Sequence, residues 1–355
     1  MPTVLHVLPH SGGGAETYIK LLEGLPGYRH ERVPLSDTRS RLRGVPSTIA
    51  GRRRVGRLAR DADLVHLHGD MAAMIAAPSV RRRPLVITTH GLHRLRRSRG
   101  AAAWLVHRRL SAAIEASART ICIAEAERED LAAALPPELH SRLVVVANGV
   151  APCPPADPDR RQQARRMLGL EDGEVAALFV GQLEERKDPL GAIAAVEAAR
   201  AGGAGIVLLL AGGGPLEGEV LARQGPGVRP LGHCDDMEEL YTAADIFLMP
   251  SHREGMSFAL LEAMAHGLAP VVSDGPGHGE TVGRAGVLFP AGDQQAMTDR
   301  LAALAADSGA RARLGAAAGE RIRTELSLER FLEGTRTQYE AALKAPGRGG
   351  GAELV

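Results

Sequence analysis

The chain has 355 residues, of which 45% are apolar and 24% charged, with a formal net charge of +1. These values are typical of a globular protein, and the length predicts two domains of similar size rather than one core. No apolar run approaches the ~18 residues of a membrane-spanning helix, and the N-terminus lacks a signal-peptide pattern. Aromatic residues make up only 3%, which argues against a nucleic-acid surface that stacks on bases. The scattered cysteines Cys122, Cys153 and Cys234 suit neither a zinc site nor a disulfide framework, so we expect a reducing cytoplasm.

Short apolar runs alternate with helical stretches along the first half of the chain. Strands are predicted at residues 3–8, 64–67, 85–89, 120–124 and 143–147. Helices are predicted between most of them, as at residues 16–25 and 101–115. This alternation predicts a parallel sheet with right-handed crossovers.

A glycine-rich turn, His10-Ser-Gly-Gly-Gly-Ala-Glu16, follows the first predicted strand. Its glycines allow the backbone to approach a phosphate at the start of the next helix. The turn fails as a dinucleotide-binding fingerprint, because Thr17 occupies the position of the third glycine. A purely structural turn is the alternative.

Four histidines lie at the ends of predicted strands in this half, at His66, His68, His90 and His93. His66 and His68 share one strand face, which makes a metal site conceivable. No carboxylate or cysteine completes such a site at a suitable spacing, so we expect no metal. We expect one histidine to act on a substrate hydroxyl and the others to pack normally.

Arginine is concentrated in the first third of the chain, between Arg39 and Arg109, and includes the run Arg52, Arg53 and Arg54. Solvated helix faces explain such a concentration most simply. An anionic acceptor or an anionic membrane surface would also attract it. We do not expect a nucleic-acid partner.

The proline-rich segment 148–158 predicts a hinge or linker between the two halves. We therefore expect domains at residues 1–155 and 156–325, a helix at 326–343 that can cross back to the first domain, and a disordered tail at 344–355. The second half repeats the strand–helix alternation, with strands predicted at 176–180, 206–211, 227–231, 246–249 and 269–273. Two doubly wound domains bind ligands at the carboxyl ends of their strands.

Two loops of the second half follow predicted strands. The loop from Val180 to Asp188 contains Lys187 and Arg186, which can meet a diphosphate leaving group, and Gln182, which can donate a hydrogen bond. An exposed charged loop is the alternative. The segment Leu210-Ala-Gly-Gly-Gly-Pro215 forms a further turn where the backbone can pass close to a ligand.

Glu254 and Glu262 bracket the start of a predicted buried helix at residues 258–265. Glu262 lies in the middle of that apolar helix, where a carboxylate is costly unless a polar group meets it. Glu254 lies in the preceding loop, beside free N–H groups that favour an anion. The pair can be up to ~12 Å apart along a helix axis, which matches the span from the sugar to the ribose of a nucleotide-sugar. A single ion-paired glutamate is the simpler alternative.

In this order and spacing, the motifs resemble the retaining glycosyltransferases of GT-B fold (glycosyl transferases group 1), the family of sucrose synthases and bacterial mannosyl- and glucosyltransferases. The resemblance extends from residue 3 to about residue 343. Besides the loops above, it includes Leu64-Val-His-Leu-His-Gly69, Thr88-Thr-His-Gly91, Ala147-Asn-Gly-Val150, Ala244-Asp-Ile-Phe-Leu-Met-Pro-Ser251 and Gly286-Val-Leu-Phe-Pro-Ala-Gly-Asp293.

The resemblance implies two Rossmann-like domains that face each other across a cleft. It implies transfer of a hexose-type sugar from a nucleoside-diphosphate-sugar to an acceptor hydroxyl with retention, without a metal or cofactor. A bacterial glycan, a glycolipid or a secondary metabolite would be the product. The alternatives are a sugar-nucleotide hydrolase or epimerase, and a non-catalytic partner that binds a sugar-nucleotide.

The resemblance also assigns roles to residues. Glu262 would bind the ribose, Glu254 the donor sugar, and Lys187 the diphosphate. His90 would lie beside the donor sugar and the acceptor, and together with Lys187 and Glu254 would form the catalytic set. The remaining donor-binding positions would be Gly13, Gly14, Gly181, Gln182, Arg186, His233, Cys234, Gly255, Met256, Ser257 and Phe258.

The chain departs from the family pattern at Gln182, where an arginine or lysine usually accompanies the Lys187 position. Either Arg186 substitutes for that cation or turnover is slow. Ala124 also replaces the usual serine before Glu125. The acceptor, the sugar, the base and the oligomeric state stay open. An anionic or lipid-linked acceptor is one option. We expect a cytoplasmic protein that contacts the inner face of the membrane at most peripherally.

Overall fold

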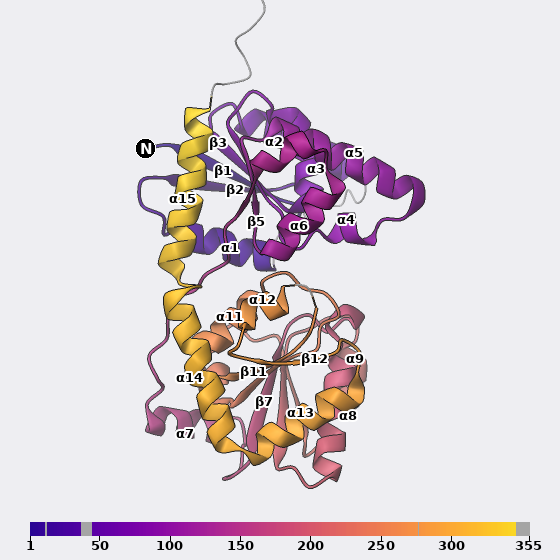
Figure 1. Cartoon of the computed structure of the whole chain (residues 1–355), viewed down its shortest axis with the longest axis vertical. Coiled ribbons are helices and arrows are strands. Elements are labelled where there is room, and N and C mark those ends of the chain that lie inside the picture. Colours follow the sequence, from indigo (N-terminus) through magenta and orange to yellow (C-terminus); the bar gives the residue numbers. More distant parts are fainter. Residues whose placement is uncertain (11–12, 37–44, 276, 346–355) are drawn as a thin grey trace, which may run out of the picture. The chain divides into compact units, whose positions relative to one another are not determined.

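A computed structural model describes residues 1–10, 13–36, 45–275 and 277–345, without the side chains of residues 45–48 and 93 (Figure 1). The chain forms two compact units. The first contains Met1–Asn148 and Leu328–Val355, and the second contains Gly149–Ser327. Most of the expected tail, residues 346–355, lies outside the described residues.

The first unit contains a sheet of six parallel strands in the order β2-β1-β3-β4-β5-β6. The strands are β1 (Thr3–Leu8), β2 (Arg29–Pro34), β3 (Leu64–His68), β4 (Leu85–Thr88), β5 (Arg119–Cys122) and β6 (Leu143–Val145). The helices are α1 (Gly14–Leu22), α2 (Val45–Leu58), α3 (Gly69–Val80), α4 (His93–Arg97), α5 (Gly100–Ala116), α6 (Glu125–Ala134), η1 (Pro137–Arg142) and α15 (Leu328–Lys344).

The two faces of this sheet differ in chemistry because strand side chains alternate. One face is apolar and packs on α3, with Leu5, Leu67 and Ile87 in its core. The other face carries His6, His66 and Thr88, all buried. Helix α15 covers that second face and packs against α1, where the Phe331 ring lies 4.8 Å from the Tyr18 ring.

The second unit contains another sheet of six parallel strands, in the order β12-β11-β10-β7-β8-β9. The strands are β7 (Val175–Val180), β8 (Ile206–Ala211), β9 (Val228–Gly232), β10 (Ile246–Met249), β11 (Ala269–Ser273) and β12 (Val287–Phe289). The helices are α7 (Pro158–Met167), η2 (Glu185–Lys187), α8 (Pro189–Ala201), α9 (Glu217–Leu221), α10 (Glu238–Ala243), α11 (Phe258–Ala265), α12 (His278–Val282), α13 (Gln294–Ala306) and α14 (Ser308–Thr324).

Every strand predicted from the sequence is present, which confirms two doubly wound, Rossmann-like units. Two strands were not predicted. Strand β2 lies at an edge of the first sheet, pairs only with β1 and carries mostly polar and charged residues. Strand β12 has only three residues and lies at an edge of the second sheet. Edge strands need few buried side chains, so the apolar pattern that identifies a central parallel strand is absent from them.

The strand orders fix where ligands can approach each sheet. In the second unit, chain order reverses between β7 and β10, so the loops after these neighbouring strands leave in different directions. In the first unit the same reversal occurs between β1 and β3. Such points form crevices at the carboxyl ends of the strands.

Within the described part of the chain, no helix combines the length and apolar character needed to span a membrane.

Candidate functional site

The loops that follow β7 and β10 bring two cations onto one carboxylate. Lys187 Nζ lies 2.6 Å from Glu254 Oε1. Arg186 donates to the same oxygen and also contacts Glu184 Oε1 at 2.7 Å. The Lys187 and Glu254 side chains are each only 12% exposed. Residues far apart in the sequence therefore meet at the reversal point of the sheet.

Backbone packing holds the Lys187 loop in place. A Cβ atom on Gly212 would lie 1.8 Å from the Gly181 carbonyl oxygen, and one on Gly214 would lie 2.6 Å from that of Leu183. The glycine turn after β8 is thus explained by close approach to a neighbouring loop. Asp188 then begins α8 by accepting a hydrogen bond from the Gly191 N–H at 3.0 Å.

Glu254 is ionised in this environment. Burial alone would raise its pKa, but the adjacent Lys187 and Arg186 cations outweigh burial and hold the pKa below its ordinary value. An ionised carboxylate only accepts hydrogen bonds, so its unused oxygen positions suit hydroxyl groups of a ligand.

A third loop, after β11, supports the Glu254 loop and was not anticipated from the sequence. A Cβ atom on Gly277, whose φ is +91°, would lie 2.7 Å from the Gly255 carbonyl oxygen. The next residue, His278, is fully buried, and its Nδ1 lies 3.1 Å from Ser273 Oγ. Burial lowers the pKa of His278, and the nearby Glu254 charge acts in the opposite direction. A histidine after Gly275-Pro276-Gly277 carries little signal in a sequence.

Glu262 has the polar partner that its apolar helix requires. The helix α11 occupies Phe258–Ala265, as predicted, and the Tyr241 hydroxyl donates to Glu262 Oε2 at 2.9 Å. The His266 ring stacks on Tyr241 with centroids 5.0 Å apart. Burial raises the pKa of Glu262, while the Tyr241 hydrogen bond and His266 act to lower it. A carboxylate bonded by one tyrosine retains capacity for further hydroxyl donors.

The other predicted positions of the second unit lie around these loops. Met256 and Phe258 are buried, Gly255 is buried, and Ser257 precedes α11 without a side-chain cap. Cys234 is partly buried, with its Sγ 3.7 Å from the Gly232 carbonyl oxygen, whereas His233 is exposed. Gln182 is exposed as well. Arg186, which pairs with the same Glu254 oxygen, supplies the second cation next to Lys187.

In the first unit, the described glycines of the glycine-rich turn are Gly13 and Gly14, since Ser11 and Gly12 lie outside the described residues. Gly13 has φ +76° and precedes α1, and a Cβ atom on either glycine would have open space around it. Both glycines are exposed. The backbone here is accessible to a ligand.

His90 is half-buried and holds a strained backbone, with φ +50° in the turn after β4. A non-glycine residue in this region costs about 1–3 kcal/mol and is concentrated at functional sites. Its Nε2 lies 3.0 Å from Nδ1 of His68, and its ring meets the Tyr18 ring edge at 4.8 Å. The side chain of His93 lies outside the described residues.

The structure places His66 and His68, which we expected to pack normally, in a buried hydrogen-bonded cluster. His66 and His68 join a third buried histidine, His6, and ligand nitrogens of these three lie within 4.8 Å of one another. All six ring nitrogens have hydrogen-bond partners within the described residues: His30, His68, His90, Thr88, Tyr339 and His6. A metal here would have to break several of these bonds. His6 was missed because it stands alone in its strand.

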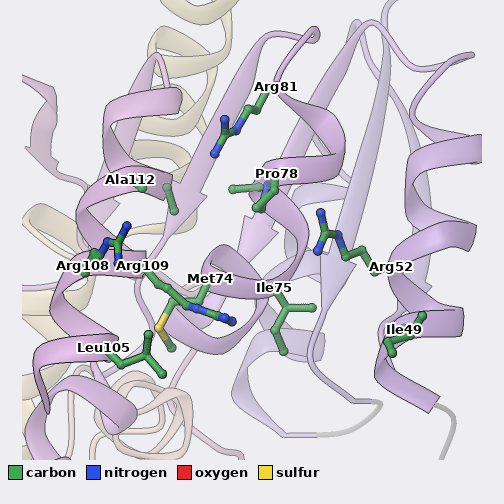
Figure 2. A pocket seen from close by; sticks show the side chains of 12 residues that line it. Ile49, Arg52, Met74, Ile75, Pro78, Arg81, Leu105, Arg108, Arg109 and Ala112 are labelled. Atoms are coloured by element: carbon green, nitrogen blue, oxygen red, sulfur yellow. The ribbon is translucent and has the colours of Figure 1, made fainter. Parts of the chain in front are cut away.

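An arginine-lined groove of about 520 Å³ lies between α2, α3 and α5. Figure 2 shows Arg52, Arg81 and Arg109 extending toward the α3 residues that form the floor. That floor is apolar, with Met74, Ile75 and Pro78, and the remaining lining includes Ile49, Leu105 and Arg108. Trp104 precedes the lining residue Leu105 in the sequence, and its side chain is 62% exposed. We name this feature the arginine groove; Arg39, Arg41 and Arg43 lie outside the described residues.

Comparison with known proteins identifies relatives over most of the chain. The family described as Glycosyl transferases group 1 matches residues 174–307, and Glycosyltransferase Family 4 matches residues 5–152. A D-inositol 3-phosphate glycosyltransferase of Salinispora arenicola is 31% identical over 336 residues, which are 83% of this chain and 72% of that protein. An alpha-maltose-1-phosphate synthase of Mycolicibacterium smegmatis is 27% identical over 319 residues, 79% of each chain.

Among solved structures, Anabaena HepE in complex with UDP-glucose has a TM-score of 0.78 at 16% sequence identity. The alignment covers 96% of this chain and 100% of HepE. At this identity the similarity concerns the fold.

Proposed function

The chain belongs to the glycosyltransferases of GT-B fold, and on that premise we propose that it transfers a hexose-type sugar from a nucleoside-diphosphate-sugar to an acceptor hydroxyl. The observation that carries the proposal is the pairing of Lys187 and Arg186 with Glu254 at the reversal point of the second sheet. HepE, which shares the fold, forms complexes with UDP and with UDP-glucose.

The two cations suit a departing diphosphate. An ammonium has three N–H donors and a guanidinium has five, and Glu254 and Glu184 occupy only some of them. The remaining donors are preorganised in a partly buried position, where they stabilise developing phosphate charge more strongly than in water. The first N–H groups of α11, which begins at Phe258 without a side-chain cap, add to the same field.

We assign Glu254 to hydroxyl groups of the donor sugar and Glu262 to those of the ribose. Both carboxylates offer acceptor positions beyond their present partners. The protein then acts by orienting the sugar and stabilising the leaving group. We propose retention through front-face departure of the diphosphate, which helps to deprotonate the acceptor hydroxyl. The Lys187 and Arg186 charges make a metal unnecessary in this scheme.

The proposal is tested by screening nucleoside-diphosphate-sugars for thermal stabilisation, because a ligand at 100-fold its Kd stabilises by ~2.7 kcal/mol. The stabilising donor is then incubated with candidate hydroxyl acceptors. We expect turnover that requires the acceptor and a glycoside that keeps the anomeric configuration of the donor by NMR. Release of free sugar without an acceptor would indicate a hydrolase, and binding without any product would indicate a non-catalytic partner.

Glu262→Ala is expected to weaken binding of the donor and of the free nucleoside diphosphate equally, by about 10- to 100-fold. A hydrogen bond to a charged group contributes ~1.5–3 kcal/mol, and the ribose is common to both ligands. Isothermal titration calorimetry measures the two affinities. Glu238→Ala is the control, because Glu238 is exposed and contacts the adjacent His266. Unchanged nucleotide affinity in Glu262→Ala would remove Glu262 from the site.

For the acceptor, we propose an anionic amphiphile held at an anionic membrane surface by the arginine groove. The groove combines four guanidinium groups with an apolar floor, which suits a phosphate on a lipid chain. Arg108 also lies over the Trp104 ring, 5.4 Å from its centroid, so the exposed indole is part of the same surface.

Replacing Arg81, Arg108 and Arg109 together with glutamine is expected to lower partitioning to anionic vesicles by about 100-fold at low salt. Each basic residue near such a surface contributes ~1 kcal/mol. Co-sedimentation with vesicles measures the partitioning. The matched control replaces Arg53, Arg54 and Arg57, which are exposed on α2 and do not line the groove. Equal losses in both variants would mean general charge attraction, and wild type that stays in the supernatant would favour a water-soluble acceptor.

A further inference from the structure

Glu262 differs from Glu254 in the partners of its carboxylate. Lys187 and Arg186 both contact Glu254, whereas no lysine or arginine of the described residues forms an ion pair with Glu262. Instead, Glu262 Oε2 accepts from the Tyr241 hydroxyl at 2.9 Å. Among the same residues Oε1 has no hydrogen-bond partner, and it is not fully buried. This half-buried carboxylate therefore keeps acceptor positions open for neutral donors of a ligand.

The backbone of Glu262 is fixed by the helix that carries it. The neighbouring Leu261 and Ala263 are fully buried. The Glu262 carbonyl oxygen accepts from the His266 backbone N–H at 3.1 Å and lies 2.8 Å from Nδ1 of the His266 ring. Only the side-chain torsions of Glu262 are left to decide where its carboxylate lies.

Tyr241 restricts those torsions through its hydroxyl. Tyr241 lies on α10 and is 3% exposed, and its ring stacks on the His266 ring with centroids 5.0 Å apart and planes 27° apart. Two acceptors face its single proton: Glu262 Oε2 at 2.9 Å and the Ala259 carbonyl oxygen at 3.4 Å. The carboxylate oxygen is the nearer and has the better distance. The hydroxyl thus holds Oε2 in place and leaves Oε1 as the free oxygen.

The free acceptor positions of Glu262 match two adjacent hydroxyls. A carboxylate has about four lone-pair positions, and Tyr241 occupies one of them. The 2′- and 3′-hydroxyls of a ribose can therefore both donate to Glu262. A 2′-deoxyribose offers one of these donors, and a 2′,3′-dideoxyribose offers neither. A site built to bind a hydroxyl rejects an analogue without it, because the polar group of the site is left unpaired.

We propose that Tyr241 is a positioning residue for Glu262, and that the pair makes the donor site select ribonucleoside diphosphates over their deoxy forms. The ribose as ligand of Glu262 rests on the proposed function. Tyr241, Glu262 and His266 all belong to the second unit, so the inference concerns that unit alone. The expected donors are sugars of ribonucleoside diphosphates, and sugars of deoxythymidine diphosphate should bind poorly.

Calorimetry with three forms of one nucleotide tests the proposal. The nucleoside diphosphate selected by the thermal screen, UDP, GDP or ADP, is compared with its 2′-deoxy and 2′,3′-dideoxy forms. In wild type the dideoxy form should bind about 10- to 100-fold more weakly than the ribose form, the range for hydrogen bonds to a charged group. Tyr241→Phe should weaken the ribose form about 3- to 10-fold and change the dideoxy form by less than about twofold.

The controls separate action through Glu262 from a general effect on the fold. Tyr241→Phe keeps the ring that stacks on His266, so the variant should fold, which its melting temperature checks. Tyr28→Phe removes the hydroxyl of a half-buried tyrosine in the first unit and should leave all three affinities as in wild type. In a Glu262→Ala background, Tyr241→Phe should cause no further loss, because the carboxylate that it positions is gone.

Equal affinity of wild type for the three forms would overturn the inference. A loss in Tyr241→Phe that is the same for all three forms would do so as well, since a merely structural role predicts that pattern, and so would no loss at all. An equal loss with and without the Glu262 carboxylate would show that Tyr241 does not act through it. Wild type that binds none of these nucleotides would contradict the proposed function itself, whereas binding without discrimination would leave that function standing.

Discussion

Replacing Lys187 with alanine is expected to lower kcat by roughly a hundredfold or more, the effect of losing one preorganised charge-stabilising group. In the structure the Lys187 side chain is only 12% exposed and its ammonium lies against Glu254, so water cannot fully replace it. Binding of the intact donor should weaken less than turnover, because the charge on the leaving diphosphate grows as the glycosidic bond breaks. Steady-state kinetics with saturating acceptor measure both parameters.

Two variants separate charge from position. Lys20→Ala removes an exposed lysine in the other unit and should leave kcat within about twofold, since exposed charges contribute little. Lys187→Arg keeps the charge but not the geometry and should retain part of the activity. If Lys187→Ala lost less than about tenfold in kcat, Arg186 alone would be sufficient for the leaving group, and Lys187 would be a structural partner of Glu254.

Glu254→Gln is expected to lower kcat by about 10- to 100-fold while changing the Kd of free nucleoside diphosphate by less than about threefold. The carboxylate is assigned to the sugar, and a hydrogen bond to a charged group contributes ~1.5–3 kcal/mol. Glutamine keeps the shape of the side chain but removes the charge that holds Lys187 and Arg186 together. Kinetics and calorimetry on the same preparation measure the two quantities.

Glu184→Gln is the matched control, because Glu184 contacts the same Arg186 at 2.7 Å but is 30% exposed. Its kcat should stay within about threefold of wild type.

The stability difference between wild type and Glu254→Gln should also depend on pH. Because the pKa of Glu254 is lowered in the folded state, its stabilisation is present above the unfolded pKa of ~4.3 and is lost as pH falls through the lower folded value. A Glu254→Gln enzyme with nearly full turnover would contradict the assignment.

The sheets were predictable because their central parallel strands are buried on both faces and are mostly apolar. Strands such as Ile206–Ala211 and Ile246–Met249 are buried throughout, and their sequences show it. The edge strand Arg29–Pro34 has one buried residue, Val33, and its charged pattern resembles a loop. Its position became clear only from pairing with β1.

The candidate site was predictable in part for a related reason. Loops that follow strands β7 and β10 were singled out, and the structure brings Lys187, Arg186 and Glu254 of those loops into contact. Which cation accompanies Lys187 was not predictable, because it depends on the side-chain direction within the short helix Glu185–Lys187. The contacts of His6 with His30 and His68 were missed because these residues come from separate strands, and no spacing along the sequence relates them.

The chain order of the two units constrains how the protein is made. The second unit is one continuous segment, Gly149–Ser327, so it can fold as soon as that segment has left the ribosome. The first unit cannot be completed then, because Phe331 and Tyr339 of α15 are buried against residues synthesised more than two hundred positions earlier, including Tyr18 and His66. Its histidine-bearing face therefore stays uncovered through most of translation, and chaperones would meet the nascent chain there.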